Sequence, residues 1–344
     1  MMDKFLWHND ELGQLIQARA ADLYTRLINL DAENLGMPDY CLSYYKSSHS
    51  TRLFFSIETS AQLLYKALHT SRKKTEDIVL MDYGAGVGTL FLLAKLIGCK
   101  KVIYNDHLED WKKSAELIAN AIGVHIDMYV VGDIEECLNS LDNAGIRCDI
   151  ITSRNVIEHI YRLNDFYKLI YEKQPGALVF SSTTANKNNP ASVVKHILWH
   201  RRWEKVFRGK RLAVIQQELT GMPISKMKML AIATRGMATA DLKHAIERYR
   251  KTGSVPDPGK HGTNTCDPSN GVWAEHLLSL KQYKQLIGEN HYHISFEPGF
   301  WDTHYTRKYM NAVGKFFNKI IRKGGQNALR VAPFIYVIAK PRTR

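Results

Sequence analysis

A glycine-rich turn between an apolar run and a helical pattern constrains this 344-residue chain most strongly. Residues 78–81 read IVLM, residues 82–89 read DYGAGVGT, and apolar side chains continue at helical spacing over 90–97. A buried strand that turns through such glycines into a helix lets the backbone approach a ligand where a Cβ atom would collide. The dinucleotide fingerprint G-x-G-x-x-G would need a glycine at Thr89, so this turn, G-x-G-x-G, predicts a different nucleotide-type site.

Four further strand patterns follow at regular intervals, separated by helical ones. They cover residues 101–106, 128–131, 148–153 and 177–182. This alternation predicts an α/β fold with a parallel sheet and right-handed crossovers. The second strand ends in Asp106, 18 residues after Gly88, where a doubly wound sheet places a carboxylate for ribose hydroxyls.

The segment after the fourth strand, residues 155–160, reads NVIEHI. Together with the glycine turn, Asp106 and Asp133, it makes the chain resemble the class I S-adenosylmethionine-dependent methyltransferases, in the branch with a V-I-E-H-I-like segment. The resemblance covers roughly residues 76–185 and two late strands. It implies a Rossmann-like, mostly parallel seven-stranded sheet, S-adenosyl-L-methionine as cofactor, and methyl transfer as the activity.

The resemblance also implies which residues bind the cofactor: Asp82, Gly84, Ala85, Gly86, Gly88, Asp106, Asp133, Ile134 and Asn155. The glycines would lie beneath the methionine part, with Asp82 near its ammonium group. Asp106 would accept the ribose hydroxyls, Asp133 and Ile134 would contact adenine, and Asn155 would lie near the methyl group. The alternatives are structural: a tight turn for the glycines, a helix N-cap for Asp106, a turn acid for Asp133 and ordinary capping for Asn155.

His159 is the candidate general base, because histidine titrates near neutral pH and can take a proton from a hydroxyl or amine. The alternative is a structural role, in which His159, one turn into a predicted helix, only forms a hydrogen bond with the backbone. Glu158 and His159 alone do not make a metal site, so we expect no metal. Further candidates for the acceptor pocket are Tyr44, Tyr45, His49 and His200.

Two motifs of related enzymes are absent from the residues after the fourth strand. Neither [DN]-P-P-[YFW] nor a Pro-Cys nucleophile stands there; the chain reads Ser153-Arg154-Asn155 instead. The first motif belongs to relatives that methylate base or glutamine amino nitrogens, so its absence disfavours that chemistry. Other RNA targets stay open.

Four regions are expected along the chain. Residues 1–75 are predicted to be a helical lid over the cofactor, or else a helical pair that only packs on the sheet. Residues 76–185 form the cofactor-binding core, 186–290 a helical and loop insertion that binds the acceptor, and 291–344 the closing strands and helix. Within the insertion, helices are expected at 193–207, 240–251 and 274–287, with an ordered loop or mobile flap at 253–271.

Positive charge is concentrated outside the cofactor motifs. The chain carries +13 overall, and residues 195–251 and 307–344 each carry +10, the latter without any acid. Such segments attract phosphates, nucleic acid or an acidic membrane face, or they are solvated helix faces. The leading hypothesis is therefore methyl transfer, at oxygen, to a small-molecule or glycan-like anionic acceptor. An RNA methyltransferase using both basic segments and a non-catalytic cofactor-binding scaffold are the alternatives.

Composition adds two expectations. Five scattered cysteines without C-x-x-C spacing favour a reducing, cytoplasmic environment. No apolar run approaches the ~20 residues of a membrane span, and the N-terminus lacks a signal-peptide core. The sequence gives no indication of oligomeric state.

Overall fold

The computed structural model describes residues 4–257 and 259–342. Its centre is one seven-stranded sheet with the order β3-β2-β1-β4-β5-β7-β6. The strands are β1 (Val79–Tyr83), β2 (Lys101–Asp106), β3 (Met128–Val131), β4 (Ile150–Arg154), β5 (Leu178–Thr183), β6 (Tyr292–Pro298) and β7 (Ile335–Pro341). Strands β1 to β5 pair in parallel, whereas β7 pairs antiparallel with both β5 and β6. The predicted α/β fold with a mostly parallel seven-stranded sheet is confirmed.

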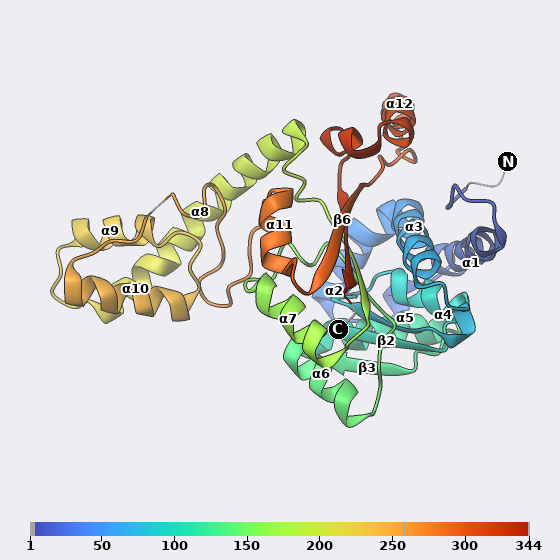
Figure 1. The fold of residues 1–344 in the computed structure, drawn as a ribbon, viewed down its shortest axis with the longest axis horizontal. Coiled ribbons are helices and arrows are strands. Elements are labelled where there is room, and N and C mark those ends of the chain that lie inside the picture. The colour runs from blue at the N-terminus through green and yellow to red at the C-terminus, as the bar shows by residue number, and fades with distance from the viewer. Residues whose placement is uncertain (1–3, 258, 343–344) are drawn as a thin grey trace.

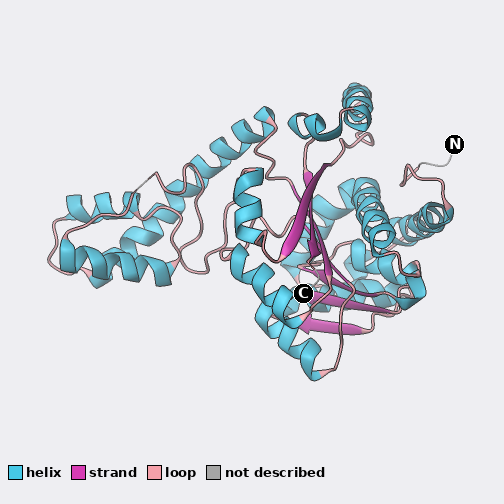
Figure 2. Cartoon of the chain, in the orientation of Figure 1, coloured by secondary structure: helices cyan, strands magenta, loops and turns pink. Residues whose placement is uncertain are grey.

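Helices cover both faces of the sheet (Figure 2). One face packs against α1 (Glu11–Ile28), α3 (Leu53–Ser71), α4 (Leu90–Leu96) and α5 (Glu109–Ala121), and these elements share one large apolar core. The other face packs against α6 (Ile134–Asn143), α7 (Leu163–Lys173) and α11 (Leu280–Ile287) around a second core. The central strands β1, β2, β4, β5 and β7 are mostly buried, as their apolar runs require, whereas the edge strands β3 and β6 are more exposed.

The insertion projects sideways from the sheet (Figure 1). It consists of α8 (Pro190–Glu218), α9 (Ile224–Ala233) and α10 (Thr239–Thr252), which bury a small apolar core of their own. Helix α8 is far longer than the predicted 193–207, and α9 was not predicted at all. The predicted helix ended too early partly because Arg211 is a basic residue at a position that is fully buried, so the apolar pattern is interrupted there. Arg211 pairs with Glu204 at 2.6 Å.

The segment between α10 and α11 is tied to its surroundings. Lys210 of α8 pairs with Asp267 at 2.6 Å, and His200 binds the backbone oxygen of Glu275 at 2.8 Å. Asn264 accepts the backbone N–H of Leu277 at 2.8 Å. These contacts favour the ordered loop over the mobile flap.

After the sheet's sixth strand comes α12 (Lys308–Lys323), which lies at the upper edge of Figure 1 together with the first turns of α8. It is the helix that was expected among the closing elements at 291–344. Within the described residues, no helix combines the length and apolar character needed to cross a membrane. All five cysteines are buried and free.

Candidate functional site

A cavity of about 620 Å³ opens at the carboxyl ends of the parallel strands. Its lining includes most of the predicted site: Asp82, Gly84, Ala85, Gly86, Gly88, Asp106, Asp133, Asn155 and His159. Ile134 is absent from the lining, because its side chain packs into the core beneath α6. Parallel strands that end at one edge therefore bring together residues spread over more than seventy positions of sequence.

The three glycines of the turn serve different purposes. A Cβ atom at Gly84 would lie 2.6 Å from Val156 Cγ2, and one at Gly88 would lie 2.7 Å from the Ala85 oxygen. Gly86 has a φ of +52° but no atom within 4 Å of the Cβ position. Packing thus constrains Gly84 and Gly88, and a positive φ constrains Gly84 and Gly86. Of the three, Gly86 is the one that leaves open space for a ligand.

Asp106 ends β2 and is almost fully buried. Its Oδ2 accepts the Gly86 N–H at 2.9 Å, and its Oδ1 accepts the Leu108 N–H at 3.3 Å. His107 Nδ1 lies 3.1 Å from the same Oδ1, and this contact raises the pKa of His107. Asp106 therefore joins the glycine turn to the next strand and keeps a carboxylate at the cavity.

Asp82 is buried beneath the cavity, and the partly buried Arg154, which sequence reasoning did not single out, influences its charge. Burial raises the pKa of Asp82 to about 7, against the opposing effect of Arg154 and of a hydrogen bond from Thr152 at 3.2 Å. Arg154 Nη1 donates to the Ser56 oxygen and the Thr59 hydroxyl, both at 2.7 Å. Arg154 thus fixes α3 against the glycine turn. An arginine ending a buried strand was the available signal.

Asp133 and Asn155 each have a structural role: Asp133 caps a helix, and Asn155 adopts a left-handed backbone conformation. Asp133 is the N-cap of α6, where its Oδ1 accepts the N–H groups of Glu135 and Glu136 at 2.9 and 3.1 Å. Asn155 adopts the left-handed conformation, with φ of +58°, and its N–H donates to the Ser182 oxygen at 2.8 Å. Such backbone strain is commonly held at functional sites. Its exposed side chain lies at the cavity.

His159 lies in a turn before α7, not one turn into a helix as the sequence suggested, because α7 begins only at Leu163. Its Nδ1 lies 2.8 Å from the Trp273 carbonyl oxygen, and the Trp273 N–H donates back to the His159 oxygen at 3.2 Å. A carbonyl oxygen only accepts, so Nδ1 carries the proton and neutral His159 has a free lone pair on Nε2. The geometry prepares that nitrogen to accept a proton.

Glu158 points elsewhere. It is buried outside the cavity lining, no hydrogen bond of ordinary geometry reaches its carboxyl oxygens, and burial raises its pKa. Its backbone oxygen accepts the His276 N–H at 2.7 Å, which attaches the loop before α11 beside His159. In the part of the chain that the structure describes, no group of three or more His, Cys, Asp or Glu side chains could hold a metal ion.

Of the other candidates for the acceptor pocket, two line the cavity and two do not. Tyr44 and His49 line the cavity, and burial lowers the pKa of His49 to about 3, so it is neutral. Tyr45 is buried against His49 rather than in the lining. His200 is buried at the base of the insertion, bonded to the Glu275 oxygen.

Sequence reasoning missed several lining residues: Tyr40, His107, Trp111, Arg154, Tyr161 and 270–272. Residues 270–272 form a turn around Gly271, which has a φ of +78°, at the end of the segment that was expected to be an ordered loop or a mobile flap. Of the predicted lid, residues 40–49 reach the cavity, whereas α1 and α3 pack in the core. The basic segment at 195–251 contributes no residue to the lining of this cavity, so the lining does not support its expected contact with the acceptor.

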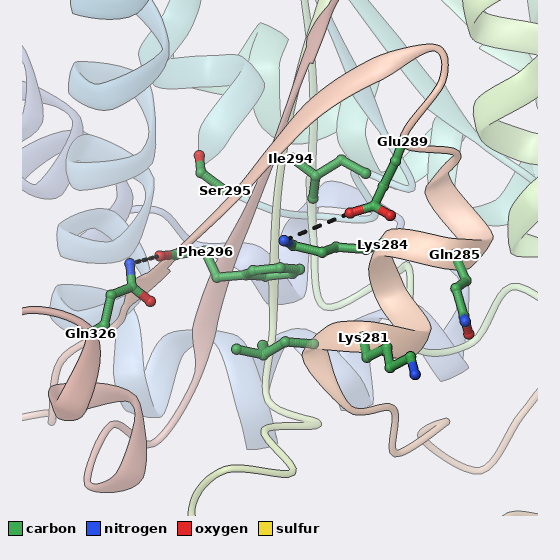
Figure 3. A pocket seen from close by; sticks show the side chains of 9 residues that line it. Lys281, Lys284, Gln285, Glu289, Ile294, Ser295, Phe296 and Gln326 are labelled. Atoms are coloured by element: carbon green, nitrogen blue, oxygen red, sulfur yellow. Dashed lines mark hydrogen bonds and ion pairs between the residues drawn. The ribbon is translucent and has the colours of Figure 1, made fainter.

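A second cavity, of about 590 Å³, lies between α11 and β6 (Figure 3). Some of its polar groups pair with one another: Lys284 lies 3.7 Å from Glu289, and Gln326 Nε2 donates to the Phe296 oxygen at 3.1 Å. It has neither a glycine turn nor carboxylates at parallel strand ends. The first cavity is therefore the candidate site.

Comparison with known proteins gives limited information. No known family model matches the chain, and no curated protein matches it. Similar solved structures include the ribosomal protein L11 methylase from Lactobacillus delbrueckii subsp. bulgaricus, at 20% identity and a TM-score of 0.28 over 36% of this chain and 60% of that one. An S-adenosylmethionine-dependent methyltransferase from Clostridium acetobutylicum is 15% identical, with a TM-score of 0.32 over 42% and 56% of the two chains.

The PH0226 protein from Pyrococcus horikoshii OT3 is similar over more of its length. The match covers 87% of this chain and 99% of that one, at 12% identity and a TM-score of 0.43. This chain spans less than two thirds of the L11 methylase and of the clostridial enzyme. Likenesses this weak assign no activity, so function has to be inferred from the cavity and its residues.

Proposed function

We propose that this protein binds S-adenosyl-L-methionine in the cavity at the carboxyl ends of β1, β2 and β4, and transfers its methyl group to an oxygen atom of a small-molecule or glycan-like acceptor. The observation that carries the proposal is the convergence of a glycine turn, a buried carboxylate and an oriented histidine in one cavity. Each element alone occurs in many folds; together they supply binding and proton transfer.

The residues present fit such a cofactor. The cavity is within the range of about 300–1,000 Å³ typical of small-molecule sites. Gly86 leaves open space above the turn, Asp106 presents a carboxylate suited to ribose hydroxyls, and Asp82 presents a second acid where a cationic amine would stabilise its charged form. When bound, the cofactor supplies an electrophilic methyl group on a sulfonium.

His159 then serves as the general base. The Trp273 carbonyl holds the proton on Nδ1, so Nε2 can take the proton from an acceptor hydroxyl as the new oxygen–carbon bond forms. The pairing of His159 with Trp273 fixes the imidazole plane, so little reorganisation is needed for this transfer.

The cavity lining beyond the predicted cofactor residues is mostly aromatic and polar, and Arg154 is the one Lys or Arg among its described residues. Tyr40 and Tyr44 lie against Trp111, with ring centroids 5.4 and 5.2 Å apart, and Tyr161 completes the lining near His159. Aromatic walls with a few polar groups suit the ring of a sugar or a similar hydroxylated compound. The anionic character expected of the acceptor depends on the basic segments alone.

The experiment is transfer of a labelled methyl group from S-adenosyl-L-methionine into fractionated cell extract. The parent should label a glycan or small-molecule fraction, and His159→Gln should lose transfer while still binding the cofactor. Asp110→Asn, an exposed charge change near Asp106, is the matched control and should retain activity. Label that is removed by ribonuclease would favour the RNA alternative. Cofactor binding without any transfer would favour the scaffold.

A further inference from the structure

Helix α12 has three distinct faces. Gly314, Asn318 and Ile321 are buried against the body of the protein, where Asn318 bonds both backbone groups of Trp301. A second face exposes large apolar side chains at spacings of four, three and four residues: Tyr309 (64% exposed), Val313 (49%), Phe316 (61%) and Ile320 (38%). This spacing places all four on one stripe of the helix. Nothing in the described residues covers that stripe.

The third face is basic. Residues 307–323 contain six Lys and Arg and no acid, and Lys308, Lys315 and Lys319 lie along one flank of the apolar stripe. Within the described chain, no carboxylate forms an ion pair with the lysines of α12, and Asp302, which precedes the helix, pairs with Arg52 instead. An apolar stripe with a basic flank is the pattern of a helix that lies in the plane of a membrane interface.

Helix α8 supplies a second, independent observation. Its first half exposes Val194, Leu198 and Val206, interspersed with exposed Arg201, Arg202 and Lys205. The helix start is attached to the end of the α12 region, because Asn186 and Asn189 both donate to the Ala332 oxygen, at 2.8 and 3.0 Å. Helix α12 and the first turns of α8 lie at the upper edge of Figure 1, and the rest of α8 descends away from it.

We propose that α12, with the first half of α8, binds the surface of an anionic membrane. Lysines near such a surface each contribute to binding, and the four apolar side chains enter the acyl boundary. Nucleic acid fits less well, because two of the four exposed apolar residues, Val313 and Ile320, have no ring for base stacking. A second copy fits less well, since pairing through the stripe would bring acid-free basic flanks together.

The test is sedimentation of the full chain with vesicles of phosphatidylcholine alone or with 30% phosphatidylglycerol. The parent should bind the anionic vesicles and lose binding in 0.5 M salt. Lys315→Gln with Lys319→Gln should weaken binding by about fivefold per lysine. Phe316→Ser should weaken it about tenfold, given partial burial of one aromatic side chain. Ile28→Ser, with 57% exposure on α1, is the matched control and should bind as the parent does.

Three outcomes would overturn the proposal. They are a parent that sediments with neither vesicle, an Ile28→Ser variant that loses as much binding as Phe316→Ser, and a parent that shifts single-stranded RNA but leaves vesicles free. Circular dichroism shows whether Phe316→Ser is folded. If it is not, the variants of the exposed lysines still test the proposal. Proposed methyl transfer is measured separately with a soluble acceptor fraction, so failure of one proposal leaves the other standing.

Discussion

Replacing Asp106 by asparagine should weaken S-adenosyl-L-methionine binding strongly, by an amount that its contacts allow us to work out. A carboxylate offers about four acceptor positions. The N–H groups of Gly86 and Leu108 occupy two of them, and the exposed His107 ring, at 3.1 Å, can turn away. Two positions are therefore free for two ribose hydroxyls, which is the number the cofactor presents.

The expected loss follows from the strength of those bonds. A hydrogen bond to a charged group contributes about 1.5–3 kcal/mol, and a neutral one about 0.5–1.5 kcal/mol. The asparagine side chain is a neutral acceptor, so each of the two ribose bonds becomes weaker. The binding free energy lost over both bonds is about 2–3 kcal/mol, or roughly 30- to 150-fold in the dissociation constant. Asp106→Ala should weaken binding at least tenfold. Calorimetry measures this, with Asp110→Asn as the control for a nearby charge change. An unchanged dissociation constant in a folded Asp106→Asn variant would refute the assignment.

Three further predictions test other parts of the account. Gly86→Ala should destabilise the protein by about 1–2 kcal/mol, because alanine there is forced into the left-handed backbone region, and it should also abolish cofactor binding. A thermal melt measures the stability and calorimetry measures the binding. Full binding by this variant would remove Gly86 from the site. His159→Gln should lower kcat by about 10²–10⁴-fold and leave cofactor affinity unchanged, and normal turnover would make His159 purely structural. Burial and the neighbouring Asp302 raise the pKa of Glu58 to about 9, so the folded state holds a proton that the unfolded state loses near pH 4.5. The parent should therefore lose stability as pH rises between these values, by about 1.4 kcal/mol per pH unit. Glu58→Gln should abolish that dependence of the unfolding free energy on pH, measured by urea unfolding between pH 5 and 8. If the unfolding free energies of the two proteins changed with pH in parallel, Glu58 would not be the buried acid responsible.

The sheet could be predicted because its signals are local. Apolar runs that end in glycine or acid identify β1, β2 and β3, and parallel pairing brings their carboxyl ends together without further information. The cavity residues that these ends carry were predictable for the same reason.

What could not be predicted depends on contacts distant in sequence. The Trp273 carbonyl that orients His159 lies 114 residues away, and Arg154 reaches back 98 residues to Ser56. Periodicity also failed in α8, because the buried Arg211, paired with the partly exposed Glu204, interrupts its apolar pattern. The sequence could not show that Ile134 packs into the core rather than lining the cavity, because its position beside Asp133 indicates nothing about side-chain direction.

Calorimetric titration of the unaltered protein with S-adenosyl-L-methionine, and separately with NAD, tests the central claim most directly. The account predicts saturable binding of one S-adenosyl-L-methionine per chain and no heat with NAD, because the turn lacks the third glycine of the dinucleotide fingerprint. Binding of NAD in place of S-adenosyl-L-methionine, or of neither compound by the folded protein, would contradict the assignment of this cavity as a methyl-donor site.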